Sequence, residues 1–415
     1  MTKGGSRLAP PPAKCGMSSS NDEAARPPTL APGHDYPSMY REFIPMFAED
    51  DACAAYLEKL RWPDGFVCPA CNVAAVPWRQ TRDRLVCSSC RSQSSVCAGT
   101  ILDKTRTPLT TWFEAAWHVT TAKNGISAKA LERTGTMGTS YRVAWTMLQR
   151  YRVAMVRAER GRLSGEVEVD ETLVGGIKPG GKRGRGAETC IVLIAVEMKQ
   201  PKGFGRVRMR HVPDASGANL IPFICDAVAP GSMVCTDGWI GYNGLSNQAY
   251  GHKKTVMSSS GDPAHVSMPG VHRISALLKR WLLGTHQGSF APTHLQGYLE
   301  EFTFRFNRRT SHSRGLVFRR LLEQAVITSP ITEANVTHGY NWFPLAAKDA
   351  RRSSPTTPLL FFGVNLRNSC PSVFAARAWI SKAAPCTTLS LSPHLRACPR
   401  RGGDRLLRRL RDRGQ

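Results

Sequence analysis

The chain has 415 residues, enough for two or three domains with separate cores, and 41% of them are hydrophobic, as in globular proteins. Its net charge of +25 suggests a nucleic-acid partner, with a merely soluble basic protein as the alternative. The thirteen cysteines favour metal binding in a reducing cytosol over a secreted disulfide framework, and no apolar run reaches the roughly 18 residues needed to span a bilayer. We therefore expect a soluble cytoplasmic protein with no membrane association.

The N-terminal part of the chain divides into an arm and a helical segment. Residues 1–36 are rich in Pro, Gly, Ser and Ala, which predicts a disordered arm. The pattern then becomes helical as far as Trp62. The apolar residues expected to face one core are Phe43, Met46, Phe47, Ala54, Tyr56, Leu57 and Leu60.

Two Cys-x-x-Cys pairs give the clearest local signal. Cys68 and Cys71 are separated by fifteen residues from Cys87 and Cys90. Zn²⁺ prefers four tetrahedral thiolates, each pair supplies two from one tight turn, and the intervening segment suffices for a hairpin. Four protein ligands leave no open position for water, so the sequence predicts structural Zn²⁺ in a zinc-ribbon domain over residues 37–100. The basic and aromatic residues around the pairs suit either a nucleic-acid surface or a solvated basic face: Trp78, Arg79, Arg82, Arg84 and Arg91.

Three helices are predicted between residues 101 and 160. They cover about 108–121, a segment from Ile126 with Ser127 as a possible N-cap, and 139–158, with glycines between the last two. This order is typical of a helix-turn-helix, but a three-helix bundle joining two domains would show it too. In the first case the DNA-facing side chains would be Tyr141, Arg142, Gln149, Arg150 and Arg152. Val143, Met147 and Tyr151 would face the core.

After Glu166 the pattern changes to strands mixed with helices, which predicts a mixed α/β sheet. Expected strands include Val167 and Val169 and the segments 190–196, 207–212 and 233–236. Expected helices cover 216–228, 272–284 and 294–308.

Acidic residues stand at the ends of two of these strands. Glu166, Glu168 and Asp170 alternate and share one face, which indicates either a divalent-metal site or a solvent-exposed edge strand. Asp237 ends the apolar strand at 233–236. Acids at the ends of neighbouring strands can share Mg²⁺ ions, and two such ions can activate water or a 3′-hydroxyl against a phosphodiester.

At these residues the sequence resembles bacterial insertion-sequence transposases of the DDE superfamily, in the branch with an N-terminal zinc ribbon. The matching stretches are RWPDGFVCPAC, EVDETLVGG, VCTDGWIGY, HRISALLKRWLLGTHQGS and HLQGYLEEFTFRFNRR. The resemblance implies an RNase H-like catalytic domain over residues 161–325, preceded by the ribbon and a helix-turn-helix-like segment. It implies Asp170 on the first strand and Asp237 on the fourth as catalytic ligands of Mg²⁺ or Mn²⁺.

The resemblance also implies the partners. These are double-stranded DNA, as terminal inverted repeats and as target, and further copies of the chain in a synaptic complex. The reaction would be cleavage at the element ends followed by strand transfer, in the nucleoid of a bacterium.

The third catalytic ligand departs from the family pattern. The family places an Asn or Glu a few residues after a His, whereas here His272 is followed by Arg273, Ile274 and Ser275. We nominate Glu301 in YLEEF, with a surface acid as the alternative interpretation, and His272 or Ser275 as possible assistants of the metal.

The C-terminal extension, residues 326–415, is expected to be poorly ordered and basic. Residues 351–415 carry thirteen Lys or Arg and only two acidic residues. A read-through extension and an arm that attracts DNA both fit this composition. The missing ligand and this tail leave open an inactive remnant that still binds DNA. A zinc-ribbon regulator that dimerises through its α/β domain is the third possibility.

Overall fold

The computed structural model describes residues 30–81, 84–134, 138–157, 159–175, 189–255, 268–288, 290–340 and 342. Most of the predicted N-terminal arm and the part of the C-terminal extension beyond residue 342 lie outside these residues. No helix in the described part of the chain is long and apolar enough to cross a membrane.

A first core is built from helices at both ends of the described chain. Its helices are α1 (Tyr40–Met46), α2 (Asp50–Arg61), α3 (Leu109–Thr121), α4 (Ala128–Arg133), α5 (Tyr141–Ala154), α11 (Arg314–Ala325) and α12 (Glu333–His338). The apolar residues predicted to share one core between Phe43 and Leu60 do so. Ser127 is the N-cap of α4, because its side chain accepts a hydrogen bond from the backbone N–H of Ala130.

Aromatic rings close this first core around α11. The ring of Phe318 lies within 6 Å of Phe43, Phe47, Phe113 and Trp117. Such ring pairs add to the gain from burial, so α11 and the N-terminal helices share one core. Val326, Ile331 and Val336 are also buried here. The predicted start of a poorly ordered extension at residue 326 is therefore too early, because apolar side chains as far as α12 are covered.

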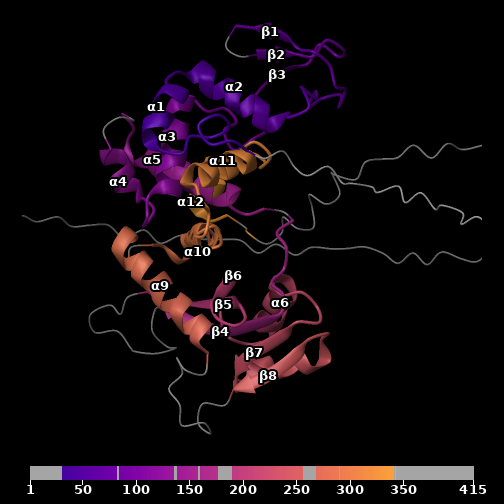
Figure 1. Cartoon of the computed structure of the whole chain (residues 1–415), viewed down its shortest axis with the longest axis vertical. Coiled ribbons are helices and arrows are strands. Elements are labelled where there is room, and N and C mark those ends of the chain that lie inside the picture. The colour runs from indigo at the N-terminus through magenta and orange to yellow at the C-terminus, as the bar shows by residue number, and fades with distance from the viewer. Residues whose placement is uncertain are drawn as a thin grey trace, which may run out of the picture. The chain divides into compact units, whose positions relative to one another are not determined.

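The second module is a five-stranded mixed sheet (Figure 1). Its strands are β4 (Glu166–Val174), β5 (Cys190–Met198), β6 (Phe204–Val212), β7 (Met233–Asp237) and β8 (Gly251–Thr255). The spatial order is β6-β5-β4-β7-β8. β5 is antiparallel to β4 and β6, whereas β7 is parallel to β4 and β8. This central placement of the first strand, with the fourth parallel beside it, is the RNase H-like fold that the resemblance implied.

Helices cover both faces of the sheet, as Figure 1 shows for α9 and α6. One face packs on α9 (Pro269–His286) and α10 (Pro292–Phe306). The other face packs on α6 (Gly217–Ala227) and the 3₁₀ segment η1 (Ile240–Asn247). β4 alternates between the two layers, because Val167 and Val169 belong to the α6 side.

Side-chain amides of α10 protect the outer strand β6. Gln296 accepts a hydrogen bond from the N–H of His211 at 2.8 Å, and Asn307, which ends α10, accepts one from the N–H of Val207 at 2.8 Å. Both amides also donate to carbonyls of β6. These bonds occupy backbone groups that an open sheet edge would offer to another chain.

Candidate functional site

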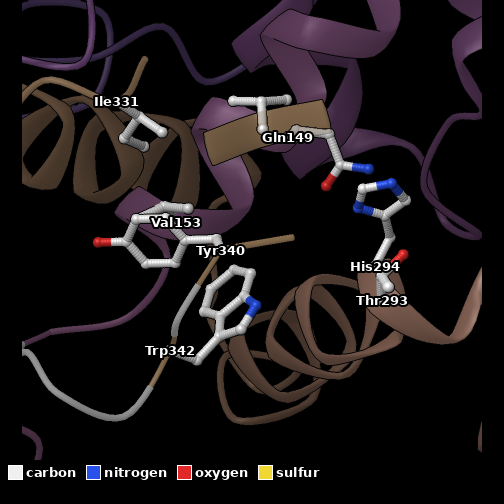
Figure 2. A pocket seen from close by; sticks show the side chains of 8 residues that line it. Gln149, Val153, Thr293, His294, Ile331, Tyr340 and Trp342 are labelled. Carbon is white, nitrogen blue, oxygen red and sulfur yellow. The ribbon is translucent and has the colours of Figure 1, made fainter. Parts of the chain in front are cut away.

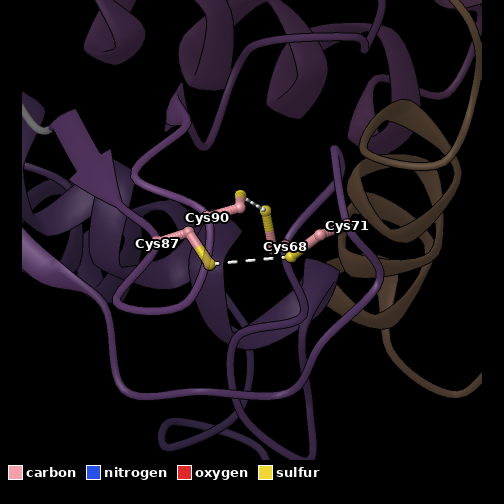
Figure 3. A group of neighbouring side chains, drawn as sticks. All are labelled: Cys68, Cys71, Cys87 and Cys90. Atoms are coloured by element: carbon pink, nitrogen blue, oxygen red, sulfur yellow. Dashed lines mark hydrogen bonds between the residues drawn. The ribbon is translucent and has the colours of Figure 1, made fainter.

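The four predicted cysteines meet at one point (Figure 3). Their Sγ atoms all lie within 4.8 Å of one another. The Sγ atoms of Cys68 and Cys90 are 3.6 Å apart, and those of Cys71 and Cys87 are 3.8 Å apart. The two pairs therefore interlock across the site.

Both knuckles are built in the same way. The N–H of Asn72 donates to the carbonyl of Cys68, and the N–H of Arg91 donates to the carbonyl of Cys87. Asn72 and Arg91 have φ of 57° and 63°, the left-handed turn that reverses the chain after each pair. The knuckles flank a small sheet of β1 (Trp78–Gln80), β2 (Arg84–Val86) and β3 (Gln93–Ser95).

The donor set fits Zn²⁺. The cluster contains four soft sulfur ligands and no oxygen ligand. The backbone N–H of Cys71 contributes most to lowering the pKa of the Cys68 thiol, while burial and the neighbouring thiols raise the pKa of Cys71 against the backbone N–H of Val73. The module has a core of only four buried residues, namely Phe66, Cys68, Leu85 and Cys87. The zinc is structural, and it supplies stability that this core is too small to provide.

Several of the basic residues around the knuckles are already engaged. Arg79 forms an ion pair of 2.7 Å with Glu58 on α2, and the guanidinium of Arg91 stacks 4.4 Å above the ring of Trp78. Trp78 remains 47% exposed. Arg82 lies outside the described residues. The surface expected to meet nucleic acid is therefore partly used to join the ribbon to α2.

The two aspartates lie on neighbouring strands, beyond the part where these strands pair. β4 and β7 pair in parallel as far as Glu168 opposite Cys235. Asp170 and Asp237 each come two residues after this last pair. Asp170 is paired with Ile194, which belongs to the core on the α9 and α10 side. Both carboxyl groups therefore belong to that face of the sheet.

A buried tyrosine reports the negative charge at this end of the sheet. The hydroxyl of Tyr242 donates to a carboxylate oxygen of Glu171 at 3.2 Å. Burial raises the pKa of Tyr242 far above its ordinary value, and the charges of Glu171, Asp170 and Asp237 raise it further. The charges of all three carboxylates therefore act on this one hydroxyl, which is expected where acidic side chains gather.

Helix α9 is held against β4 on both sides of Asp170. The buried carboxylate of Glu168 accepts a hydrogen bond of 2.9 Å from the N–H of Val271, in the first turn of the helix. The hydroxyls of Thr172 and Ser275 are 2.7 Å apart. His272 follows Val271 directly, so the geometry brings the first turn of α9, with His272 in it, alongside Asp170.

Glu168 itself is a positioning group. Burial raises its pKa, while the N–H groups of Val271 and Gly270 act in the opposite direction. A carboxylate at a helix N-terminus satisfies N–H groups that have no partner within the helix. Sequence reasoning grouped Glu168 with Asp170 but did not identify this contact.

Glu301 lies in different surroundings from the two aspartates. It is fully buried on α10, its carboxylate accepts a 2.9 Å hydrogen bond from Arg152 on α5, and Arg305 is 3.7 Å away. Arg152 is also buried and lies 4.0 Å above the ring of Tyr298. Two arginines surround this carboxylate, and none of the described contacts joins it to Asp170 or Asp237.

The DNA-facing side of α5 that we predicted is wrong for three of its five residues. Gln149 and Arg152 are buried, and Arg150 donates at 3.0 Å to the carbonyl of Ile101. Gln149 lines a small cavity of about 10 Å³ that is also walled by Thr293 and His294 of α10 (Figure 2). This face of α5 packs on α10, an element too distant in sequence for helical periodicity to reveal. Tyr141 and Arg142, at the start of α5, are exposed.

These two modules define the class: a zinc-ribbon protein with an RNase H-like domain whose neighbouring first and fourth strands each carry an aspartate. Residues 48–93 match the family model of the transposase zinc-ribbon domain, and residues 162–307 match that of the ISXO2-like transposase domain. Over these two stretches the chain is similar to insertion-sequence transposases with an N-terminal zinc ribbon.

Two further comparisons complete the findings. No curated protein matches the chain. Among solved structures, the catalytic core domain of BIV integrase is similar, with 12% identity, a TM-score of 0.24, and coverage of 36% of this chain and 85% of that one.

Proposed function

We propose that this transposase cleaves DNA at the ends of its element and joins the ends to target DNA, with Asp170 and Asp237 as the catalytic carboxylates. The observation that carries this proposal is that each aspartate comes two residues after the last parallel pair of β4 and β7, and that the charges of both act on Tyr242. Acids placed in this way on neighbouring strands can share divalent cations.

The carboxylates of Asp170 and Asp237 would hold Mg²⁺ or Mn²⁺, which supplies Lewis-acid activation of an attacking oxygen and stabilisation of the leaving oxygen. The protein's own contribution is positioning. Pairing of the strands positions the two aspartates, and a hydrogen bond from the hydroxyl of Tyr242 holds the carboxylate of Glu171. Glu168 and the Thr172–Ser275 contact fix α9 beside Asp170.

We propose His272 as the third ligand, in place of Glu301. Contacts on either side of Asp170 hold the first turn of α9 against β4, which supports His272. The two arginines around Glu301 favour a structural role for that residue. Imidazole suits Mn²⁺ better than Mg²⁺, so we expect higher activity with Mn²⁺.

The partners follow from the same proposal. The zinc ribbon and the exposed start of α5 would contribute to recognition of double-stranded terminal repeats, and several copies would assemble with two element ends. The domain limits that we propose are 37–100 for the ribbon and 161–325 for the catalytic domain. α11 lies within the second range, but it packs in the core of the helical segment that lies between the two ranges.

The experiment is cleavage of duplexes taken from the DNA that flanks the coding sequence, with Mg²⁺, Mn²⁺ or chelator. Asp170→Asn and Asp237→Asn should each abolish cleavage without weakening DNA binding, and His272→Ala should do the same. Asp226→Asn is the matched control, because Asp226 is an exposed carboxylate on α6 paired with Arg210. Full activity in either aspartate variant would refute the assigned role.

An inactive remnant that binds DNA is the second candidate. Among the described residues, the one group of three or more His, Cys, Asp or Glu with closely spaced ligand atoms is the cysteine cluster. The wild-type protein would then bind the flanking duplexes but leave them intact with either metal.

A further inference from the structure

A polar groove of about 550 Å³ lies between the segment that starts α4 and the C-terminal end of α9. One wall is formed by Asn124, Gly125, Ile126, Ser127, Lys129, Ala130, Arg133 and Thr134, and the other by Gly284, Thr285 and Gln287. The groove is separate from the aspartate end of the sheet, because its α9 residues lie at the opposite end of that helix from His272.

Specific hydrogen bonds hold the two walls together. The carbonyl of Asn124 accepts a bond of 2.8 Å from Trp281 and another of 2.8 Å from Thr285, both on α9. Arg305 donates to the carbonyls of Ala122 and Lys123 at 2.5 and 2.9 Å. The groove is thus preformed, so a ligand would lose little free energy in ordering it.

Gly125 shows how closely this loop is fitted. Its φ is +71°, and a Cβ atom there would lie 1.9 Å from the guanidinium of Arg305. The loop therefore depends on a glycine for both its turn and its contact with Arg305. Arg305 in turn lies beside the buried Glu301, so the ion-pair cluster on α10 supports the wall of the groove.

The charge of the groove is positive. Among the described residues that line it, two are cationic and none is acidic. Arg133 is exposed, and Lys129 is exposed while paired with Glu132 at 2.5 Å. Arg280 is exposed on α9 one turn before Gly284, on the same stripe of the helix. The side-chain amides of Asn124 and Gln287 add N–H donors, which suit phosphate oxygens, whereas the hydroxyls of the two lining threonines already donate to backbone carbonyls.

The length of α9 relates the groove to the proposed cleavage site. His272 and Gln287 are fifteen residues apart, and a helix rises about 1.5 Å per residue, so roughly 22 Å separate them. Stacked base pairs are spaced about 3.4 Å apart, so this distance corresponds to about six base pairs when α9 runs along the axis of the duplex.

We infer that this groove binds the phosphate backbone of duplex DNA about six base pairs from the cleaved phosphodiester. The inference rests on the proposed function for the position of the cleaved bond, but the groove's affinity for a duplex does not depend on it. Contacts with the DNA backbone carry no direct sequence information, so the groove would not read bases. It would instead fix the position of the protein along the DNA relative to the cleaved bond.

Gly284 offers a sharp test. A Cβ atom at Gly284 meets nothing within 4 Å, so side chains there enter the groove without disturbing the fold. Binding of a fluorescent 30-base-pair duplex is measured over a salt series for Gly284→Glu, Gly284→Gln and Gly284→Lys. We expect Glu to weaken binding and Lys to strengthen it, with Gln between them. Arg133→Gln should lower the slope of log affinity against log salt by about 1.

The matched controls carry the same charges outside the groove. Leu283 is 68% exposed and does not line it, so Leu283→Glu and Leu283→Lys should shift affinity less than the Gly284 pair. Arg106→Gln is the control for Arg133→Gln, because it removes an exposed cation outside the groove, before the start of α3. Equal shifts at positions 283 and 284, or an unchanged slope for Arg133→Gln, would overturn the inference. The inference would also be overturned if the protein bound a single strand in this way but not a duplex.

Phosphate ethylation interference on the flanking duplex places the contact. The Asp237→Asn protein, which leaves the DNA intact, is compared with the double variant that also carries Gly284→Glu. Loss of interference about six base pairs from the cut supports the groove. If wild type never cleaves yet the Gly284 series still shifts duplex binding, the nuclease assignment fails while the groove stands. If cleavage occurs and the series shifts nothing, the groove fails alone.

Discussion

Glu301 shows how one buried carboxylate can look catalytic in a sequence and yet stabilise a fold. Its oxygens lie beside Arg152 and Arg305, and its side chain has 0% exposure. Removing one partner of a buried ion pair leaves the other charge unpaired in a poorly solvated place. We therefore expect Glu301→Gln to lower the free energy of unfolding by about 3 kcal/mol.

Urea denaturation measures this loss. The control is Glu333→Gln, because Glu333 is an exposed acid paired with Arg142, and surface pairs contribute little. A Glu301→Gln protein as stable as wild type, but without metal-dependent cleavage, would return Glu301 to the catalytic set.

His286 makes the stability of the same region depend on pH. It is buried between the rings of Trp281 and Tyr298, and burial lowers its pKa from 6.5 to about 4. The unfolded chain therefore binds a proton that the folded chain does not between these values. Stability is complete above pH 6.5 and is lost as the pH falls toward 4.

The expected loss from this one group is about 2 kcal/mol between pH 7 and pH 5. His286→Phe keeps an aromatic ring without a titratable proton, so its unfolding free energy should fall less over the same range. Parallel pH curves for the two proteins would contradict the assignment.

At this scale the sequence predicts residues whose chemistry depends on local spacing. The four cysteines follow a ligand pattern within one hairpin, so their convergence could be anticipated. Arg152 and Glu301 are far apart in the chain, and only the packing of α5 on α10 brings them together. The periodicity of α5 predicted an exposed, polar face that includes Arg152. Periodicity alone cannot show that another helix covers this face.

At the scale of elements, the first turn of α9 depends on a side chain from β4. Glu168 accepts the N–H of Val271, and a charged acceptor at a helix N-terminus contributes about 1 kcal/mol. Glu168→Gln should lower stability by about that amount and slow cleavage, because His272 is then held less firmly. KM for the DNA should stay unchanged. Glu166→Gln, at the half-buried start of the same strand, is the control, and equal effects in both variants would argue against a positioning role.

The zinc ribbon is the element whose stability depends most on a ligand. Its core has four buried residues, two of them cysteines of the cluster. Chelation of zinc or Cys87→Ser should unfold the ribbon, while the rest of the protein keeps its melting transition. Zinc content and the fluorescence of Trp62 and Trp78 follow the change. Cys97→Ser should retain one zinc per chain, and loss of zinc in that variant would refute the ligand set.

Helices and strands with strong apolar patterns were predictable, and polar ones were not. β4, β5 and β6 lie where strands were expected, because apolar residues are almost continuous in β5 and alternate with polar ones in β4 and β6. β8 has the sequence GHKKT, and its pairing with β7 comes from the parallel register rather than from side-chain pattern. The segment 272–284 was expected as a helix, but its start at Pro269 reflects the contact with Glu168.

At the scale of the whole molecule, the order of the chain and the order of packing differ. α11 follows the catalytic sheet in sequence but closes the aromatic core of α1 and α3. α10 contacts the sheet through Gln296 and contacts α5 through Glu301. The ribbon, helical and catalytic segments drawn from the sequence therefore share cores, and a cut at residue 160 or 325 would expose apolar side chains of both parts.

The C-terminal extension adds charge to this assembly. Residues 351–415 carry thirteen Lys or Arg against two acids, and such a segment attracts DNA through counterion release whatever its sequence. A chain ending at Ala350 should bind any duplex more weakly, with a smaller dependence on salt, and still cleave the element ends with Mn²⁺. The matched variant keeps full length and replaces Arg405, Arg408, Arg409, Arg411 and Arg413 by Gln. If both proteins bind mixed-sequence DNA as tightly as wild type across the salt series, the extension makes no contribution to DNA binding.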